Sequence, residues 1–397
     1  MERAGGRAYI AGGWVRDTLR GAPPRDKDYA VAGLAGERFG ALFPSAVLAG
    51  RGFPVYRTPI GGRVCDVALA RRETKTGPGY RGFSVSFLES TSILDDMSRR
   101  DTTMNSIARD ILTGELIDPF GGAGDIASRV IRATSEHFSD DPVRALRAAR
   151  QSAQFGYSID ERTVRLMRDC RDELASEPSE RIANELARAL GTPRPSVFFR
   201  TLMEARLLDV TYPHIFALSG AESAHREDAF ERTMSILDRV SSDTDRIEAR
   251  FAALAHDIGE DREHAGEDPR RRDRIKSGVS ALRGWNAVMR LPSRWLACAE
   301  FVITERARVS EISSPGEIVD FLERLRRNPI GPDGLSAVMR AGVRETPGFL
   351  INRDKCYDAM DAISGNVLPA DLTGPARGYW LRARRAEAIM RITEGMA

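Results

Sequence analysis

The feature that most constrains the fold is a change of hydrophobic pattern near residue 131. Before it, short apolar runs bounded by glycine, proline or polar residues predict strands at 8–13, 28–33, 55–59 and 63–70, with a short helix at 14–21. After it, apolar residues recur at helical spacing, and segments end in Gly or Asp-Pro signals. We therefore expect an α+β protein, with a mixed α/β N-terminal part and an almost wholly helical remainder.

The length of 397 residues predicts more than one domain. We place the expected boundaries at 1–130, 131–215 and 216–397. The four cysteines are far apart and form no CxxC pair, which indicates neither a zinc cluster nor a disulfide framework and favours a reducing compartment. No leader-like apolar run and no 18-residue apolar segment occurs. These patterns predict a cytoplasmic protein without a membrane partner, and they leave its oligomeric state open.

The N-terminal part combines a glycine turn with an acidic pair. Asp26 and Asp28 stand at i and i+2 in an extended segment, so their carboxylates are expected on one face, where Mg²⁺ suits them. Upstream, Gly12 and Gly13 allow the backbone to approach a triphosphate, and Arg16 can reach its oxygens. A third carboxylate, Asp66, lies on a later predicted strand and is expected to complete the catalytic and metal site.

A second polar cluster occupies residues 95–110, "DDMSRRDTTMNSIARD". Arg100 is suited to pair with phosphate, whereas Asp101 and Asn105 can bond ribose hydroxyls. On a solvated surface helix the same charges would have no ligand.

These motifs resemble a known enzyme family. In order, "GGWVRD", "DKD", "GRGFPVYRT", "ALARRETKTGPGYRGF", "RRDTTMNSIA", "IDPFGG", "DDPVRALRAAR" and "SERIANEL" are similar to bacterial class II tRNA nucleotidyltransferases, the CCA-adding enzymes, in the subgroup with an HD-like domain. The resemblance covers residues 7 to 215 densely and continues more faintly to the end. It implies a polymerase-beta-like nucleotidyltransferase head with helical neck, body and tail, and the addition of C, C and A to tRNA from CTP and ATP with Mg²⁺.

Selection of C and A without a template needs side chains that read the base. Asp141 and Arg144 are three residues apart, and we expect them to be neighbours on one helix. An aspartate accepts a hydrogen bond from the amino group of cytosine or adenine, while an arginine donates to the adjacent ring nitrogen; uracil and guanine present the opposite pattern. By resemblance, Arg147 and Arg150 would also contact the nucleotide.

Two further segments complete these expectations. Residues 71–83 have Gly, Pro and basic residues but no periodicity, which predicts a mobile loop; in the family this loop takes part in the switch from CTP to ATP. The helical remainder would hold the acceptor and T-arm of tRNA through backbone and shape contacts.

His256 and Asp257 match the signature of HD phosphohydrolases, which bind a divalent metal through an upstream His, the His-Asp pair and a distant Asp. Arg232 stands at the upstream position, although His225 lies nearby, and the distant Asp is not evident in 336–348. Since a metal needs several ligands at once, we expect a weak or empty second site and a structural role for this region. His264 is a further candidate ligand.

Three other readings stay open from the sequence. A specialised sister activity, namely CC-adding, A-adding or poly(A) polymerase, would share the head motifs. A metal-dependent phosphohydrolase would act through His256 and Asp257. A noncatalytic RNA-binding scaffold is disfavoured because Asp26, Asp28 and Arg100 are all present.

Overall fold

The computed structural model describes residues 1–24, 26–49, 55–77, 82–220, 228–259, 271–306, 308–343, 346–363, 369 and 372–394. Contacts divide the chain into two compact units: unit 1 is Met1–Glu185 with Arg200–Thr211, and unit 2 is Leu186–Phe199 with Tyr212–Ala397. The expected three domains stay a prediction. The change of unit at Tyr212 lies close to the expected boundary at residue 215.

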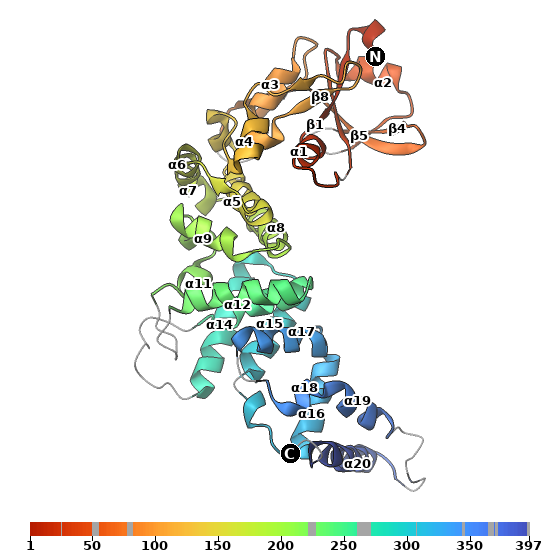
Figure 1. Ribbon diagram of the computed structural model, residues 1–397, viewed down its shortest axis with the longest axis vertical. Helices are drawn as coiled ribbons and strands as arrows, with labels where there is room; N and C mark the ends of the chain where they lie inside the picture. Colours follow the sequence, from red (N-terminus) through yellow and green to blue (C-terminus); the bar gives the residue numbers. More distant parts are fainter. Residues whose placement is uncertain are drawn as a thin grey trace. The chain divides into compact units, whose positions relative to one another are not determined.

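Unit 1 begins with a mixed sheet, drawn in red to orange in Figure 1. Among the described residues its seven strands have the order β3-β4-β5-β2-β1-β8-β9. Neighbouring strands are antiparallel except β2 and β5, which are parallel. The strands are β1 (Arg7–Ala11), β2 (Asp28–Ala32), β3 (Val47–Ala49), β4 (Val55–Ile60), β5 (Arg63–Leu69), β8 (Ala108–Asp110) and β9 (Leu116–Ile117). The four strands expected from the apolar runs are therefore present.

Side-chain alternation sorts the strand residues onto the two faces of this sheet. On one face, Ala30 and Ala32 pack with Ile93 and Met97 of α3 (Ile93–Ser98). On the other, a second cluster forms around Phe39 of α2 (Gly36–Leu42). Each face of the sheet thus has its own covering helix and its own hydrophobic core. Polar residues such as Asp28 stand where the strands begin or end, next to these cores.

The loop expected at 71–83 is a hairpin in its described part. β6 (Arg72–Lys75) pairs in antiparallel fashion with β7 (Phe83–Ser86), so the prediction of an irregular segment was wrong there. Ion pairs hold this stem: Lys75 Nζ lies 2.6 Å from Glu173 Oε1, and Arg71 Nε lies 2.8 Å from Glu73 Oε1. Residues 78–81, between the two strands, lie outside the described residues.

Short helices make up most of the rest of unit 1. Figure 1 shows α5 (Val143–Phe155) following the head, with α6 (Glu161–Asp169) and α7 (Arg171–Ala175) beside it. The other elements are α1 (Gly13–Leu19), α4 (Gly122–Ser128), α10 (Leu208–Thr211) and the paired two-residue strands β10 (Val130–Ile131) and β11 (Ser158–Ile159). Two helices, α8 (Ser179–Leu190) and α9 (Ser196–Glu204), belong partly to unit 1 and partly to unit 2. α9 ends at Glu204, and Arg206, just beyond it, takes a left-handed φ of 56°.

Unit 2 is helical throughout its described residues. Its helices are α11 (Pro213–Phe216), α12 (Ala229–Asp243), α13 (Ile247–Ala255), α14 (Arg271–Met289), α15 (Ser293–Glu305), α16 (Pro315–Arg327), α17 (Gly331–Val338), α18 (Gly348–Ile351), α19 (Arg353–Asp361) and α20 (Pro375–Glu394). Buried residues such as Val240, Ala253, Val302 and Leu322 form one core shared by α12, α13 and α15 through α20. No helix found in the described part of the chain has the length and apolar character needed to cross a bilayer.

Candidate active site

Strand pairing brings the glycine turn and the acidic pair together. β1 and β2 are antiparallel, with Ala11 opposite Asp28, so Gly12 follows β1 at the same end of the sheet at which β2 begins. Asp28 is the first residue of β2, and Asp26 lies just before the strand. The two motifs, separated by about fifteen residues in the sequence, therefore meet at one edge of the sheet.

Asp66 lies next to Asp28, on the neighbouring strand β5. Because β5 runs parallel to β2 with Tyr29 opposite Val67, the preceding residues on the two strands are Asp28 and Asp66. Partial loss of solvent, and then the charges of Asp66 and Asp26, raise the pKa of Asp28, while Arg100 opposes the shift. The three predicted carboxylates thus form one cluster in which negative charge is only partly compensated.

The backbone of Gly12 has a conformation that side chains avoid. It has a φ of 71° and a ψ of −128° and is the N-cap of α1. A Cβ atom at this position would lie 3.1 Å from Nη1 of Arg100. Arg100 itself is fixed by Asp96, at 2.9 Å, and by the carbonyl of Asn105, at 3.1 Å. A glycine is therefore required for the turn to lie against this arginine.

A hydrogen-bonded network extends from the glycine turn to α5. Arg16 Nη1 donates to Asn105 Oδ1 at 2.7 Å, and Asn105 Nδ2 donates to Asp101 Oδ1 at 3.0 Å. Asp101 is buried and also accepts from Arg147 Nε at 2.9 Å and from Gln151 Nε2 at 3.1 Å. Burial by itself would raise the pKa of Asp101, but Arg147 and Asn105 hold it well below its usual value. Asp101 is thus engaged within the protein, and its predicted contact with ribose remains a prediction.

The expected base-reading pair is not built on one helix. α5 begins at Val143, and Asp141 precedes it in an extended conformation with a φ of −115° and a ψ of 107°. The next residue is Pro142, and a residue before proline avoids the helical region. Asp141 accepts from Arg181 Nη2 at 3.0 and 2.9 Å, so its carboxylate is oriented by α8 rather than by its own helix.

Arg144 lies at the start of α5 and is buried. It donates to the carbonyl of His137, and its Nη2 lies 4.0 Å from Glu73 Oε2. Arg150 pairs with Glu185 Oε2 at 2.7 Å. Asp141, Arg144, Arg147 and Arg150 therefore each have a protein partner, which orients them.

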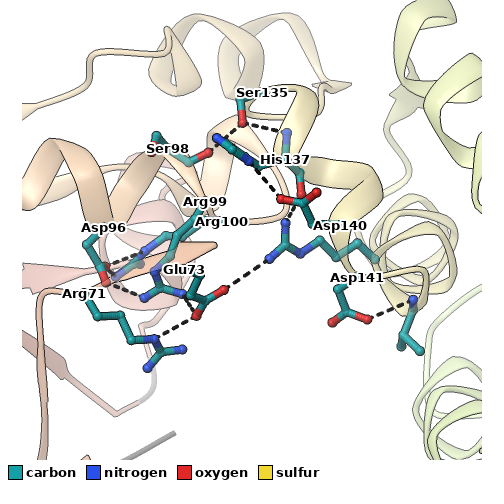
Figure 2. Close-up of polar contacts among 12 residues, drawn as sticks. Arg71, Glu73, Asp96, Ser98, Arg99, Arg100, Ser135, His137, Asp140 and Asp141 are labelled. Atoms are coloured by element: carbon teal, nitrogen blue, oxygen red, sulfur yellow. Dashed lines mark hydrogen bonds and ion pairs between the residues drawn. The ribbon is translucent and has the colours of Figure 1, made fainter. Parts of the chain in front are cut away.

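Sequence reasoning missed the residue that joins these groups, Glu73 of β6. Figure 2 shows Glu73 between Arg71 and Arg99, and Oε1 accepts from each at 2.8 Å. Since Arg144 faces its other oxygen, this 6% exposed carboxylate joins the hairpin stem, the segment after α3 and α5. An acidic residue inside "ARRETK" was the available signal, but its partners lie up to 71 residues away along the chain.

The acidic cluster fits a divalent cation that shares its coordination with a ligand. No group of three or more His, Cys, Asp or Glu side chains placed to hold a metal alone is found in the described parts of the chain. Mg²⁺, however, is usually bound through one or two carboxylates together with substrate phosphates and water. Partial burial raises the pKa of Asp28 most, and the charges of Asp66 and Asp26 add to the shift; a cation bound here would relieve that repulsion.

The predicted second site has a different character. His256 and Asp257 follow α13, and both side chains are fully buried. The Asp257 carboxylate accepts from Arg232 and from Arg306. The other candidate ligands, His225 and His264, lie outside the described residues.

Comparison with known proteins covers the whole chain. The family model described as "Poly A polymerase head domain" matches residues 8–132, and the model "Probable RNA and SrmB-binding site of polymerase A" matches residues 156–218. A multifunctional CCA protein from Methylococcus capsulatus is 34% identical, across 97% of this chain and 95% of the relative. The chain belongs to the CCA protein family. Another member, from Stenotrophomonas maltophilia, is 34% identical across 96% of this chain and 99% of its own length.

Solved structures of CCA-adding enzymes share the fold of this CCA protein family member. One, titled "The structure of CCA-adding enzyme apo form II", gives a TM-score of 0.68 at 20% identity, over 100% of this chain and 93% of that one. The Bacillus stearothermophilus CCA-adding enzyme in complex with CTP gives 0.62 at 24% identity, over 98% and 90%. The expected head followed by a helical remainder is confirmed.

Proposed function

We propose that this protein adds C, C and A to the 3′ end of tRNA without a template, using CTP and ATP and releasing pyrophosphate. The observation that carries the proposal is that Asp28 and Asp66 stand side by side on the neighbouring strands β2 and β5, next to the Gly12 turn, in a member of the CCA protein family. In the reaction, the 3′-hydroxyl of tRNA attacks the α-phosphate of the nucleotide, and the bond from that phosphate to pyrophosphate breaks.

Asp26 and Asp28 would hold Mg²⁺, with Asp66 next to them. When bound, the ion supplies positive charge to the phosphates and lowers the pKa of the attacking hydroxyl. The chain's own contribution is a group of carboxylates whose negative charge is only partly balanced within the protein. Arg100 lowers the pKa of Asp28, but partial burial and the charges of Asp66 and Asp26 outweigh it.

The glycine turn and its neighbours would orient the triphosphate. Gly12 leaves backbone accessible where a side chain would meet Arg100, and Gly13 is a second residue without a side chain beside it. Arg100 and Arg16 are half-buried and fixed by Asp96 and Asn105, so little side-chain freedom is lost when they bind phosphate oxygens.

Asp141 and Arg144 would read the base. Arg181 orients the first, and the His137 carbonyl together with Glu73 orients the second. A preorganised acceptor and donor match the Watson–Crick edges of cytosine and adenine, and each mismatch with uracil or guanine costs about 1–3 kcal/mol. We expect Arg144→Ala to reduce the preference for CTP over UTP roughly tenfold or more, as measured by kcat/KM for each nucleotide. An unchanged ratio in this variant would refute the assignment.

The helical part of unit 1 would contact the tRNA backbone. The model named for RNA binding covers 156–218, and within it α6 exposes Arg162, Arg165 and Arg168 around a cavity of about 420 Å³. Arginines on such a surface neutralise phosphates and release counterions. We expect Arg165→Ala to weaken tRNA binding and to reduce the salt dependence of log Kd by about 1.

The test of the reaction uses radiolabelled CTP and ATP, separately and together, on a tRNA transcript lacking its 3′ CCA, with Mg²⁺. Addition of two C and one A that disappears in Asp26→Ala/Asp28→Ala would support the proposal. Addition of C only, of A only or of a long A tail would instead assign a sister activity.

We also propose a cytoplasmic location, in keeping with free thiols at all four cysteines.

A further inference from the structure

Asp257 is the most deeply buried acidic residue at any of the predicted sites, with a side chain 0% exposed. It follows α13, which packs against both α12 and α15. Arg232 comes from α12, and Arg306 is the C-cap of α15; Figure 1 labels both helices in the upper part of unit 2. One carboxylate is therefore the meeting point of groups from three helices.

Both oxygens of this carboxylate are occupied by cations of the protein. Oδ1 accepts from Arg306 and Oδ2 accepts from Arg232, and these two arginine side chains are 16% and 14% exposed. His256 Nδ1 lies 2.7 Å from the carbonyl of Ala253. Its Nε2 lies 3.0 Å from Asp257 Oδ2, at an ion-pair distance but without the alignment of a hydrogen bond.

A divalent metal does not fit this donor set. A metal needs several lone-pair donors at once, whereas guanidinium groups have none and would repel a second cation. The residues described around Asp257 supply no third His, Cys, Asp or Glu ligand. A metal could reach the carboxylate only by displacing two ion pairs from the interior.

The charge requirement of the pocket is met without a metal. Burial by itself would raise the pKa of Asp257, but Arg306, His256 and Arg232 hold it well below its usual value. An isolated buried carboxylate is costly, and the two positive charges that a divalent ion would bring come here from Arg232 and Arg306.

We propose that this chain has replaced the metal of its His-Asp pair by Arg232 and Arg306, so that the region is a metal-independent clamp joining α12, α13 and α15 and has no phosphohydrolase activity. The proposal is independent of nucleotide addition, because Arg232, Asp257 and Arg306 all belong to unit 2, whereas the acidic cluster belongs to unit 1.

The first experiment removes the metal site expected in the head and asks whether another remains. The full chain carrying Asp26→Ala/Asp28→Ala is incubated with Mg²⁺, Mn²⁺ or Ni²⁺, and bound metal, Tm and hydrolysis of adenosine 2′,3′-cyclic phosphate are measured. We expect no stoichiometric metal, a Tm unchanged by EDTA and no hydrolysis above background. Tight metal binding with one equivalent per chain, or hydrolysis that Asp257→Asn abolishes, would overturn the proposal.

The second experiment measures the coupling within the clamp. Arg232→Ala and Asp257→Asn are each expected to lower Tm by several degrees, and the double variant should lose much less than the sum of the two. The matched control is the exposed pair Arg326–Asp361 of the same unit, at 2.6 Å, where Arg326→Ala should shift Tm by a degree or less. Additive losses at Arg232 and Asp257 would contradict the clamp. If these variants do not fold, the metal and EDTA measurements on the first protein still decide the question.

Discussion

Asp28 in unit 1 and Asp257 in unit 2 are both aspartates in motifs associated with metals, yet their surroundings are opposite. Asp28 is exposed at the start of a strand, with two further carboxylates near it, and its pKa is raised. Asp257 is buried between two arginines, and its pKa is lowered. The negative charge of Asp28 is free to interact with a cationic ligand, whereas the negative charge of Asp257 is already neutralised by arginines of the protein.

The difference shows what separates a site from a structural ion pair. A functional cation site keeps its acidic groups in excess, so the apo protein carries a repulsion that the ligand relieves. A structural pair is complete in the absence of ligand. The following measurements test this contrast, beginning with the largest expected effect.

Asp28→Ala is expected to lower the rate of CCA addition by about three orders of magnitude or more, because it removes a carboxylate proposed to hold the metal. Single-turnover assays with saturating CTP and ATP measure this loss. Glu37→Ala is the matched control, since Glu37 is an exposed acid on α2, the helix that covers the opposite face of the sheet. A similar loss in both variants would show that the effect is not local to the cluster.

Asp257→Asn is expected to reduce the free energy of unfolding by about 3–5 kcal/mol, because it leaves Arg232 and Arg306 without their buried counter-charge. Urea denaturation monitored by circular dichroism gives this value. At a temperature where the variant is folded, its CCA addition should be nearly normal. A stable variant that lacks CCA addition would reverse the roles assigned to the two regions.

Asp101→Asn tests a third case, a buried carboxylate next to the proposed nucleotide site. Because the folded-state pKa of Asp101 is lowered, its contribution is complete above the unfolded pKa of about 3.9 and is lost as the pH falls toward the folded value. We expect the variant to be less stable by about 2 kcal/mol at pH 7. The difference should shrink below about pH 4.

The control for Asp101 is the partly exposed pair Arg171–Asp209, for which Asp209→Asn should cost less than about 1 kcal/mol. If the difference in the free energy of unfolding between Asp101→Asn and the wild type stays constant from pH 7 to pH 3, the charge of Asp101 is not what stabilises unit 1.

Asp28→Asn should have the smallest effect on stability, and in the opposite direction. Its pKa is raised in the folded state, so the ionised group favours unfolding as the pH rises through that pKa. Neutralising it should increase stability at pH 7 by less than about 1 kcal/mol, because the side chain is exposed and its charge is screened. Thermal unfolding at low salt detects the change, and a clear loss of stability would contradict the proposed repulsion.

The sequence predicts the strands of the head and most helices because their apolar residues follow the periods of these elements. It also predicts that Asp26, Asp28 and Asp66 form one cluster. It does not predict the β6–β7 hairpin, because Glu73 and Lys75 are held by ion pairs to distant segments rather than by a pattern of their own.

Two further features depend on long-range contacts or on local backbone rules. Asp141 lies outside α5 because Pro142 follows it, a signal that was present in the sequence but was outweighed by the helical spacing. Arg306 stands 49 residues after Asp257, and nothing in the sequence pairs them. Residue types could thus be predicted, but which charges neutralise one another could not.

The clamp around Asp257 also limits how the chain can evolve. Exchanging Arg232 or Arg306 singly for a metal ligand would leave one buried oxygen of Asp257 without its guanidinium donor, while the arginine that stays would still repel a divalent ion. A metal site at Asp257 would therefore need both arginines to be exchanged together, so no single substitution in this ion-paired group is expected to create one.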